Sequence, residues 1–153
     1  MKSIPVSFRL FDPHTDYNWV HKSWLSSERF LGSNSLVPRK LYNDAANNRI
    51  KYLLKHAVTM VAYLEDEPNV LLSFINYQIE EDNLVIHYSF TKSDFRCQGI
   101  CKELVKTINV LDLPIVITCI PNPYWYNILH EDGKLCKALY DCAYFTRGFY
   151  GSK

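Results

Sequence analysis

The spacing of apolar residues divides the chain into a helical first part and a strand-rich second part. Residues 3–10 alternate between apolar and polar as a strand does, and residues 17–25 place apolar side chains at helical intervals behind Asp16, a potential helix cap. Residues 43–56 repeat the helical spacing. The chain then continues with three β-rich runs separated by short polar turns: VTMVAYL, VLLSFINYQI and LVIHYSF. This succession predicts an antiparallel meander.

The remaining pattern predicts a strand–helix–strand unit. A helix is expected over residues 100–111, a strand over 114–120 and a last helix over 134–142. Two strands of one sheet that are joined through a helix are parallel. We therefore expect a mixed α/β (α+β) fold in a single domain over residues 1–153. Its sheet is mostly antiparallel with a parallel pair, and helices cover both faces.

Composition and charge narrow the possible functions. The 153 residues are 48% hydrophobic, enough for one compact core, and 17 Lys and Arg balance 16 Asp and Glu. This balance gives no overall basic field, so a nucleic-acid partner is not expected. No run approaches the roughly 18 apolar residues of a membrane span, and the first residues lack a sustained apolar segment. We expect a cytoplasmic protein without a membrane partner.

The cysteines suggest free thiols and no metal site. There are five, an odd number: Cys97, Cys101, Cys119, Cys136 and Cys142. Without a signal sequence, such a set favours a reducing compartment over a disulfide framework. Their spacings lack the CxxC pairs of a zinc site, and the histidines are scattered, so no metal is expected.

The segment FTKSDFRCQGI joins the last strand of the meander to the next helix through a turn that contains Gly99. The first N–H groups of a helix and its dipole form an anion site, and Arg96 adds a cation that binds phosphate through two hydrogen bonds. Lys92 and Lys102 add positive charge on either side. The alternative is an ordinary tight turn with a solvated arginine. GxxxxGK[ST] and GxGxxG are both absent, which argues against nucleotide hydrolases and dinucleotide dehydrogenases.

Residues 96–101, read Arg96-Cys97-Gln98-Gly99-Ile100-Cys101, resemble [Q/R]-x-x-G-x-[G/A], the acetyl-CoA pyrophosphate loop of the GNAT acetyltransferases. The order of the predicted elements is similar to that family over most of the chain. The resemblance implies acetyl-CoA as the cofactor, bound by these six residues with Lys92 and Lys102. Cys101 departs from the pattern, because the family has Gly or Ala there.

A second segment, CKALYDCAYF, is similar to the family's A-x-x-L-Y-x-x-x-G-F. The resemblance implies that Tyr140 is the general acid that protonates the departing thiolate. Cys136 and Tyr144 depart from the family's Ala and Gly, and Gly133 stands where the family often has an asparagine. The segments WLSSERF, VPRKLY and IHYSFTKSDFRCQGI also resemble small GNAT-like proteins of tailed phages and their bacterial hosts, which would place the chain in a bacterial or host cytoplasm.

The family's mechanism implies two further roles. Its two central parallel strands separate and expose backbone N–H groups to the thioester oxygen, which makes the amide of Phe90 the expected donor. The glutamate base of some members falls on Val85. His87 shares the face of Val85 and is our candidate base, with an ordinary core or surface histidine as the alternative. Glu80 and Glu81 are weaker candidates in a solvated turn.

Aromatic residues are candidates for the acceptor groove, because the family covers its acceptor with the first two helices and the loop after the parallel strand. The candidates are Trp19, Trp24, Tyr42, Tyr124, Trp125 and Tyr126. We favour Trp24, Tyr124 and Tyr126 as substrate-binding residues, with burial in the core as the alternative. Cys97 or Cys101 at a positive helix terminus could be a nucleophile, but neither has an evident partner base.

These features predict an enzyme that moves an acetyl group from acetyl-CoA to a primary amine by direct attack in a ternary complex. The acceptor could be a small molecule or a protein. The alternative is a catalytically inactive GNAT-like binding or structural protein, for example of a phage. The short segment after Tyr140 leaves little chain for further strands, so a homodimer partner could complete the sheet.

Overall fold

One mixed sheet organises the protein. The computed structural model describes residues 3–119 and 138–140, and in them the sheet has six strands in chain order. These are β1 (Val6–Leu10), β2 (Val58–Leu64), β3 (Glu67–Glu80), β4 (Asn83–Thr91), β5 (Ile115–Ile117) and β6 (Ala138–Tyr140). Neighbours from β1 to β4 are antiparallel, whereas β4–β5 and β5–β6 are parallel. The predicted meander and the parallel pair are therefore confirmed.

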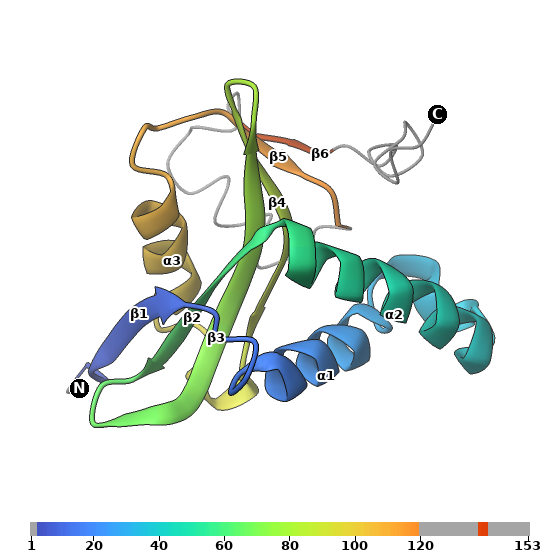
Figure 1. Cartoon of the computed structure of the whole chain (residues 1–153), viewed down its shortest axis with the longest axis horizontal. Helices are drawn as coiled ribbons and strands as arrows, with labels where there is room; N and C mark the ends of the chain where they lie inside the picture. The colour runs from blue at the N-terminus through green and yellow to red at the C-terminus, as the bar shows by residue number, and fades with distance from the viewer. Residues whose placement is uncertain (1–2, 120–137, 141–153) are drawn as a thin grey trace.

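Helices cover both faces of the sheet, as predicted (Figure 1). Helices α1 (Tyr17–Glu28) and α2 (Arg39–His56) pack on one side, and α3 (Ile100–Ile108) packs on the other. Helix α2 begins earlier than expected, directly after Pro38, and α3 ends earlier because the side chain of Asn109 bonds the backbone of Leu113. Within the described residues, no helix combines the length and apolar character that crossing a membrane requires.

The predicted helix over residues 134–142 is wrong for the part that the structure describes. Residues Ala138–Tyr140 form strand β6, which pairs with Ile115–Ile117 of β5. Pairing satisfies the backbone groups on the edge of β5, and such a tertiary contact outweighs the local helical preference of this segment. The rest of the predicted helix lies outside the described residues.

Asp16 stands at the N-cap of α1, but its side chain does not cap the helix. Its carboxylate accepts hydrogen bonds of 2.5 and 2.9 Å from the Arg9 guanidinium and one of 2.8 Å from the Asp12 amide. Burial acts to raise the pKa of Asp16, yet these hydrogen bonds hold it below its usual value. The carboxylate therefore ties the end of β1 to the start of α1.

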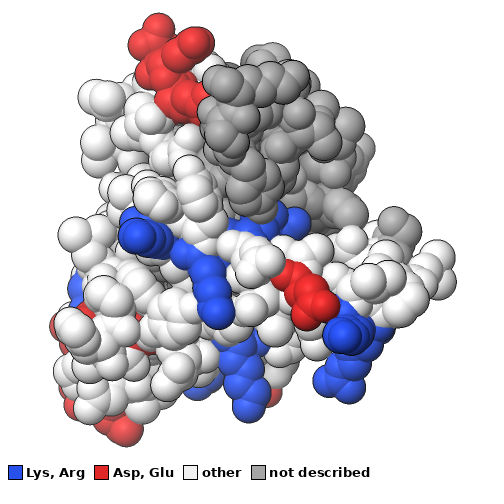
Figure 2. Space-filling model, turned by 45° about the vertical axis from the view of Figure 1, so that its right-hand side comes forward, with Lys and Arg blue, Asp and Glu red and all other residues white. Residues whose placement is uncertain are grey.

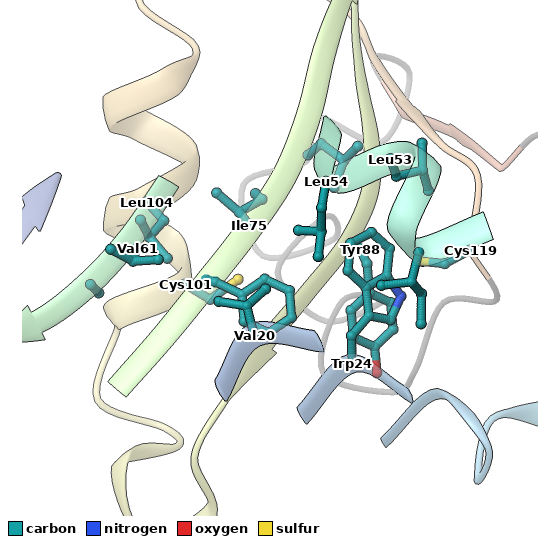
Figure 3. Packing of buried hydrophobic residues seen from close by; sticks show 14 of the residues in the cluster. Val20, Trp24, Leu53, Leu54, Val61, Ile75, Tyr88, Cys101, Leu104 and Cys119 are labelled. Carbon is teal, nitrogen blue, oxygen red and sulfur yellow. The ribbon is translucent and has the colours of Figure 1, made fainter. Parts of the chain in front are cut away.

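Trp24 lies in the core between α1 and the sheet, where only 1% of it is exposed (Figure 3). Its ring stacks on Tyr88 of β4 at 5.2 Å and 7°, and contacts Phe74 of β3 at 5.9 Å. A side chain so enclosed cannot touch an acceptor, so its assignment to substrate binding is wrong and the core alternative holds. Tyr42 is also buried, and its hydroxyl donates to the Leu25 carbonyl at 2.7 Å.

A β-bulge at His87 divides β4 into two parts. Asn76 of β3 pairs with Tyr88, whereas the next residue, Tyr77, pairs with Ile86, so His87 is the extra residue. The parallel pairing with β5 covers only residues 84–86 and ends where the Thr118 amide bonds the Ile86 carbonyl at 3.0 Å. Beyond the bulge, the described part of β4 continues along β3 alone. The two central strands thus separate at His87.

We predict that Trp24→Ala lowers the free energy of unfolding by about 3–5 kcal/mol, because it removes a fully packed indole and leaves a cavity. Urea denaturation measures the change. Trp19→Ala is the matched control, since Trp19 is only half-buried, and it should cost clearly less. Equal losses for the two variants would contradict the core assignment of Trp24.

Candidate functional site

A cleft of about 920 Å³ opens beside the second part of β4. Its walls come from α1, from β4 after the bulge, and from the segment that joins β4 to α3. Helix α1 supplies Trp19, Lys22, Ser23, Ser26 and Ser27, and Phe30 follows two residues after its end. Strand β4 supplies residues 88–91, and the loop and α3 supply Arg96, Cys97 and Cys101. The cleft therefore lies where β4 and β5 separate.

The direction of the β4 amides changes at the bulge. The Lys92 amide donates to the Leu72 carbonyl of β3 at 2.9 Å. In an antiparallel pair, the residues that bond the partner strand alternate. The Phe90 amide therefore also faces β3, and the amides of Ser89 and Thr91 face the opposite edge, toward the opening. The prediction that Phe90 supplies the exposed backbone donor is thus wrong, because the sequence does not reveal the bulge.

Phe90 contributes to the cleft through its side chain instead. Its ring meets Trp19 of α1 edge-on, with centroids 5.9 Å apart, and also contacts Phe74 at 6.0 Å. The ammonium of Lys92 lies over the Trp19 ring, 5.6 Å from its centroid. These contacts make one wall of the cleft apolar and fix Lys92 beside it.

The loop before α3 turns twice into the left-handed region, at Cys97 (φ 60°) and Gly99 (φ 79°). The first hydrogen bond of α3 runs from the Glu103 amide to the Gly99 carbonyl at 3.0 Å, so the amides of Ile100 and Cys101 precede the helical ladder. A Cβ atom built on Gly99 would meet nothing within 4 Å. Backbone amides at a helix start beside open space can receive an anion.

Arg96 is held in place at the entrance of this loop. Its Nε donates to the Thr91 carbonyl at 3.0 Å, which directs the side chain along the end of β4. Within the described residues, its two terminal nitrogens have no hydrogen-bond acceptor, and the side chain is exposed. A guanidinium in this arrangement can bind a phosphate through both terminal nitrogens.

The predicted cofactor residues divide between two hollows. Cys97 borders the cleft and also a second hollow of about 940 Å³ on the far side of the loop. Gln98, Gly99 and Ile100 line only the second hollow, which β1 and the residues before it close. The Gln98 side chain donates to the Asp94 carbonyl at 3.3 Å. Lys92 and Lys102 line neither hollow.

Known proteins match the fold rather than the sequence. Neither a protein-family model nor a curated protein matches the amino-acid sequence. The structure of a ribosomal-protein-alanine N-acetyltransferase from Brucella melitensis biovar Abortus 2308 matches with a TM-score of 0.55 and 16% identity, over 83% of this chain and 89% of that one. A GNAT family acetyltransferase from Brucella melitensis, solved with acetyl-CoA, matches with 0.51 and 13%, over 79% and 80%. The chain has a GNAT fold.

Three further comparisons define the extent of this likeness. The PaiA N-acetyltransferase of Thermoplasma acidophilum, solved with coenzyme A, matches with a TM-score of 0.52 and 10% identity, over 70% of this chain and 72% of that one. Two other matched structures are longer, and the chain spans only 38% and 44% of their length. The likeness therefore establishes the GNAT architecture.

Cys101, the departure from the GNAT loop pattern, is buried at the start of α3. Its thiol donates a long hydrogen bond of 3.7 Å to the Ser89 hydroxyl of β4. Burial raises the pKa of the Cys101 thiol to about 11, so it is not an activated nucleophile. The side chain fits the space between α3 and β4. The thiols of Cys97, Cys101 and Cys119 are free, as predicted.

His87 is buried within the sheet and does not line the cleft. Only 2% of it is exposed, and its Nδ1 lies 2.9 Å from the Thr118 hydroxyl, just past the end of β5. Burial, with a smaller contribution from Arg49, lowers the pKa of His87 to about 3. Its imidazole is therefore neutral at pH 7 and shielded from substrate, which favours the structural alternative. Glu80 and Glu81 lie at the β3–β4 turn, the far end of β4 from the cleft.

A pair of hydroxyl groups in the cleft wall has no sequence motif. The Ser27 hydroxyl of α1 and the Tyr88 hydroxyl of β4 are 2.6 Å apart, and both residues border the cleft. Burial raises the pKa of Tyr88, so its phenol stays protonated near neutral pH. No pattern in the sequence indicates this pair, or Lys22 and Ser23, because polar residues on an amphipathic helix usually face solvent.

The backbone of Tyr140 lies in line with the point where the strands separate. Tyr140 pairs with Ile117, and Ile117 pairs with Ile86, directly before the bulge. Two strand spacings place this backbone about 10 Å from β4. The side chain of Tyr140 lies outside the described residues. So do Tyr124, Trp125, Tyr126, Gly133, Cys136 and Tyr144.

Titration of His87 gives a test of its structural role. The unfolded chain binds a proton at this imidazole below about pH 6.5, whereas the folded chain resists protonation down to about pH 3. Stability from the neutral imidazole is therefore complete above pH 6.5 and is lost as the pH falls, by about 1.4 kcal/mol per pH unit. Between pH 7.5 and 5.0, wild type should lose about 2 kcal/mol more than His87→Asn in urea denaturation.

The comparison depends on the change with pH and not on the absolute stability of His87→Asn. His14→Asn is the control, because His14 is exposed, and it should follow the wild-type curve. If His87→Asn also follows the wild-type pH dependence, His87 is not a buried neutral histidine.

Proposed function

We propose that this chain transfers an acetyl group from acetyl-CoA to a primary amine, by direct attack within a ternary complex. The observation that carries the proposal is the loop before α3. Open space above Gly99, the amides of Ile100 and Cys101 and the positioned guanidinium of Arg96 together fit a diphosphate. In the GNAT fold this loop follows the strand separation. Two of the matched structures were solved with acetyl-CoA or coenzyme A.

Residues 96–101 would hold the pyrophosphate, and acetyl-CoA would supply the activated acetyl thioester. The Thr91 amide faces the open edge of β4, so we propose this group, in place of Phe90, as a donor to the developing oxyanion. Such fixed donors act most strongly where water is excluded. The apolar rings of Trp19 and Phe90, which meet edge-on, exclude water from this part of the cleft.

Two protons have to move during the transfer. The acceptor amine must be neutral to attack, yet an alkyl amine has a pKa near 10.4. We propose that the proton of the amine leaves through a water relay. The relay would pass the Ser27–Tyr88 hydroxyl pair, a polar contact in the cleft wall. We keep Tyr140 as the proposed donor of a proton to the departing thiolate, a role that comes from its resemblance to the GNAT pattern.

A second candidate function is binding without catalysis. Among the described residues that line the cleft, none is a carboxylate or an imidazole, so no side chain there is an evident general base. A GNAT-like binding protein, of a phage or another source, would need no base. The two candidates differ in turnover, and both permit coenzyme binding.

Arg96→Ala should weaken coenzyme A binding at least about tenfold, because one charge-assisted contact contributes roughly 1.5–3 kcal/mol. Isothermal calorimetry with acetyl-CoA and with coenzyme A measures the affinity. Lys106→Ala is the matched control, since Lys106 is an exposed cation of α3 beyond the loop. Gly99→Glu should abolish binding, and Gly99→Ala, with the same backbone strain but no carboxylate, separates strain from repulsion. Normal affinity in Arg96→Ala and Gly99→Glu would overturn the loop assignment.

Tyr140→Phe should lower kcat by about 10²-fold or more and leave the affinity for acetyl-CoA nearly unchanged, because only the transferable proton is lost. Release of coenzyme A in the presence of a panel of amines measures turnover, and calorimetry measures affinity. An unchanged rate would remove Tyr140 from the mechanism. Saturable cofactor binding without any turnover would favour the binding protein.

A further inference from the structure

The helical layer over residues 17–56 has a positive net charge, although the whole chain is nearly neutral. It contains seven Lys and Arg and two Asp and Glu, a net charge of +5, whereas the rest of the chain has ten against fourteen, or −4. One of the two acidic groups, Glu28, is buried and paired with Arg49. Figure 2 shows this side of the molecule, where Lys and Arg side chains spread across the surface and acidic side chains are few.

Exposed apolar side chains gather in the same layer. Of the nine large apolar side chains that are exposed in the described part of the chain, four fall in residues 30–41. They are Phe30 (77% exposed), Leu36 (84%), Val37 (38%) and Leu41 (62%). The Arg29 guanidinium donates to the Val37 carbonyl, which holds this segment against the end of α1. Four exposed apolar side chains within twelve residues make this segment a candidate contact site.

This surface is continuous with the cleft. Phe30 is exposed on the surface and also lines the cleft, and Lys22 of α1 is the cation on the same wall. A chain that lies across residues 30–41 would therefore reach the cleft past Phe30. Arg39 and Lys40 stand between Val37 and Leu41 in the sequence, so basic and apolar residues adjoin in this segment.

We propose that the α1–α2 layer is a docking surface for an acidic polypeptide that carries apolar side chains, and that its N-terminal amine enters the cleft past Phe30. The last step rests on the proposed acetyl transfer, whereas docking itself does not. Charge complementarity excludes a polycationic acceptor such as a polyamine, because Lys22, Arg39 and Lys40 would repel it. Aliphatic groups such as Leu36 and Leu41 favour apolar side chains over nucleic acid, which is bound by cations and stacked aromatic rings.

Fluorescence anisotropy tests the docking with a labelled acidic peptide. The probe has a free N-terminal alanine followed by pairs of glutamate that alternate with leucine, and the comparison peptide has lysine in place of every glutamate. The acidic peptide should bind at least about tenfold more tightly, and added salt should weaken its binding. The double variant Arg39→Glu, Lys40→Glu should abolish this preference.

The charge reversal leaves the fold intact, because Arg39 and Lys40 occupy the first turn of α2, where acidic residues stabilise a helix. Leu36→Ser with Leu41→Ser should also weaken binding by about tenfold. Lys106→Glu and Val110→Ser are the matched charge and apolar controls at α3, where Val110 is 80% exposed, and they should bind as wild type does.

Three results would overturn the proposal. The first is equal binding of the two peptides, or binding that Arg39→Glu, Lys40→Glu leaves unchanged. The second is tighter binding of a single-stranded oligonucleotide of the same charge than of the acidic peptide. The third is a dimer that the same charge reversal dissociates, which would assign the surface to a second copy. Mass spectrometry of the bound peptide with acetyl-CoA is a separate readout: docking without acetylation would count against the proposed activity alone.

Discussion

The separation of β4 from β5 depends on one extra residue. His87 is the bulge residue of β4, and the parallel pairing with β5 ends immediately before it. The bulge also exchanges the two edges toward which successive amides point, so Ser89 and Thr91 face the opening and Phe90 faces β3. The His87–Thr118 hydrogen bond joins the two strands at the point of separation. Without the bulge, β5 could continue along β4 and close the cleft.

Three polar contacts then hold α1 against this opening. Arg9 binds Asp16 at the start of the helix, Ser27 binds Tyr88 near its end, and Glu28 pairs with Arg49 of α2. Burial raises the pKa of Glu28, and the charge and hydrogen bond of Arg49 act against that effect. Apolar packing of Trp24 on Tyr88 lies between them. These contacts tie the cleft wall to β1, β4 and α2, and the groups that make them come from distant parts of the sequence.

The two sides of the cleft differ in chemistry. The α3 side offers backbone amides and Arg96, which suit a diphosphate, and the α1 side offers Lys22, hydroxyl groups and the ring of Phe30. Both sides carry positive charge, so an acceptor that binds beside an anionic cofactor need not itself be a cation. The chain is nearly neutral, yet its α1–α2 layer is basic, and the net charge of the whole chain does not reveal this difference.

The sequence determined the elements that local spacing encodes: the three strands of the meander, the two first helices, and the loop in which Gly99 and Arg96 precede α3. Tertiary structure decided the rest. The bulge at His87 depends on how β3 and β4 pair, and it moved the exposed amides away from Phe90. Residues 138–140 form a strand because they pair with β5. Trp24 packs on Tyr88 in the core and does not line the acceptor groove as expected. Each of these outcomes rests on contacts between residues far apart in the chain, and spacing along one strand or helix carries no record of them.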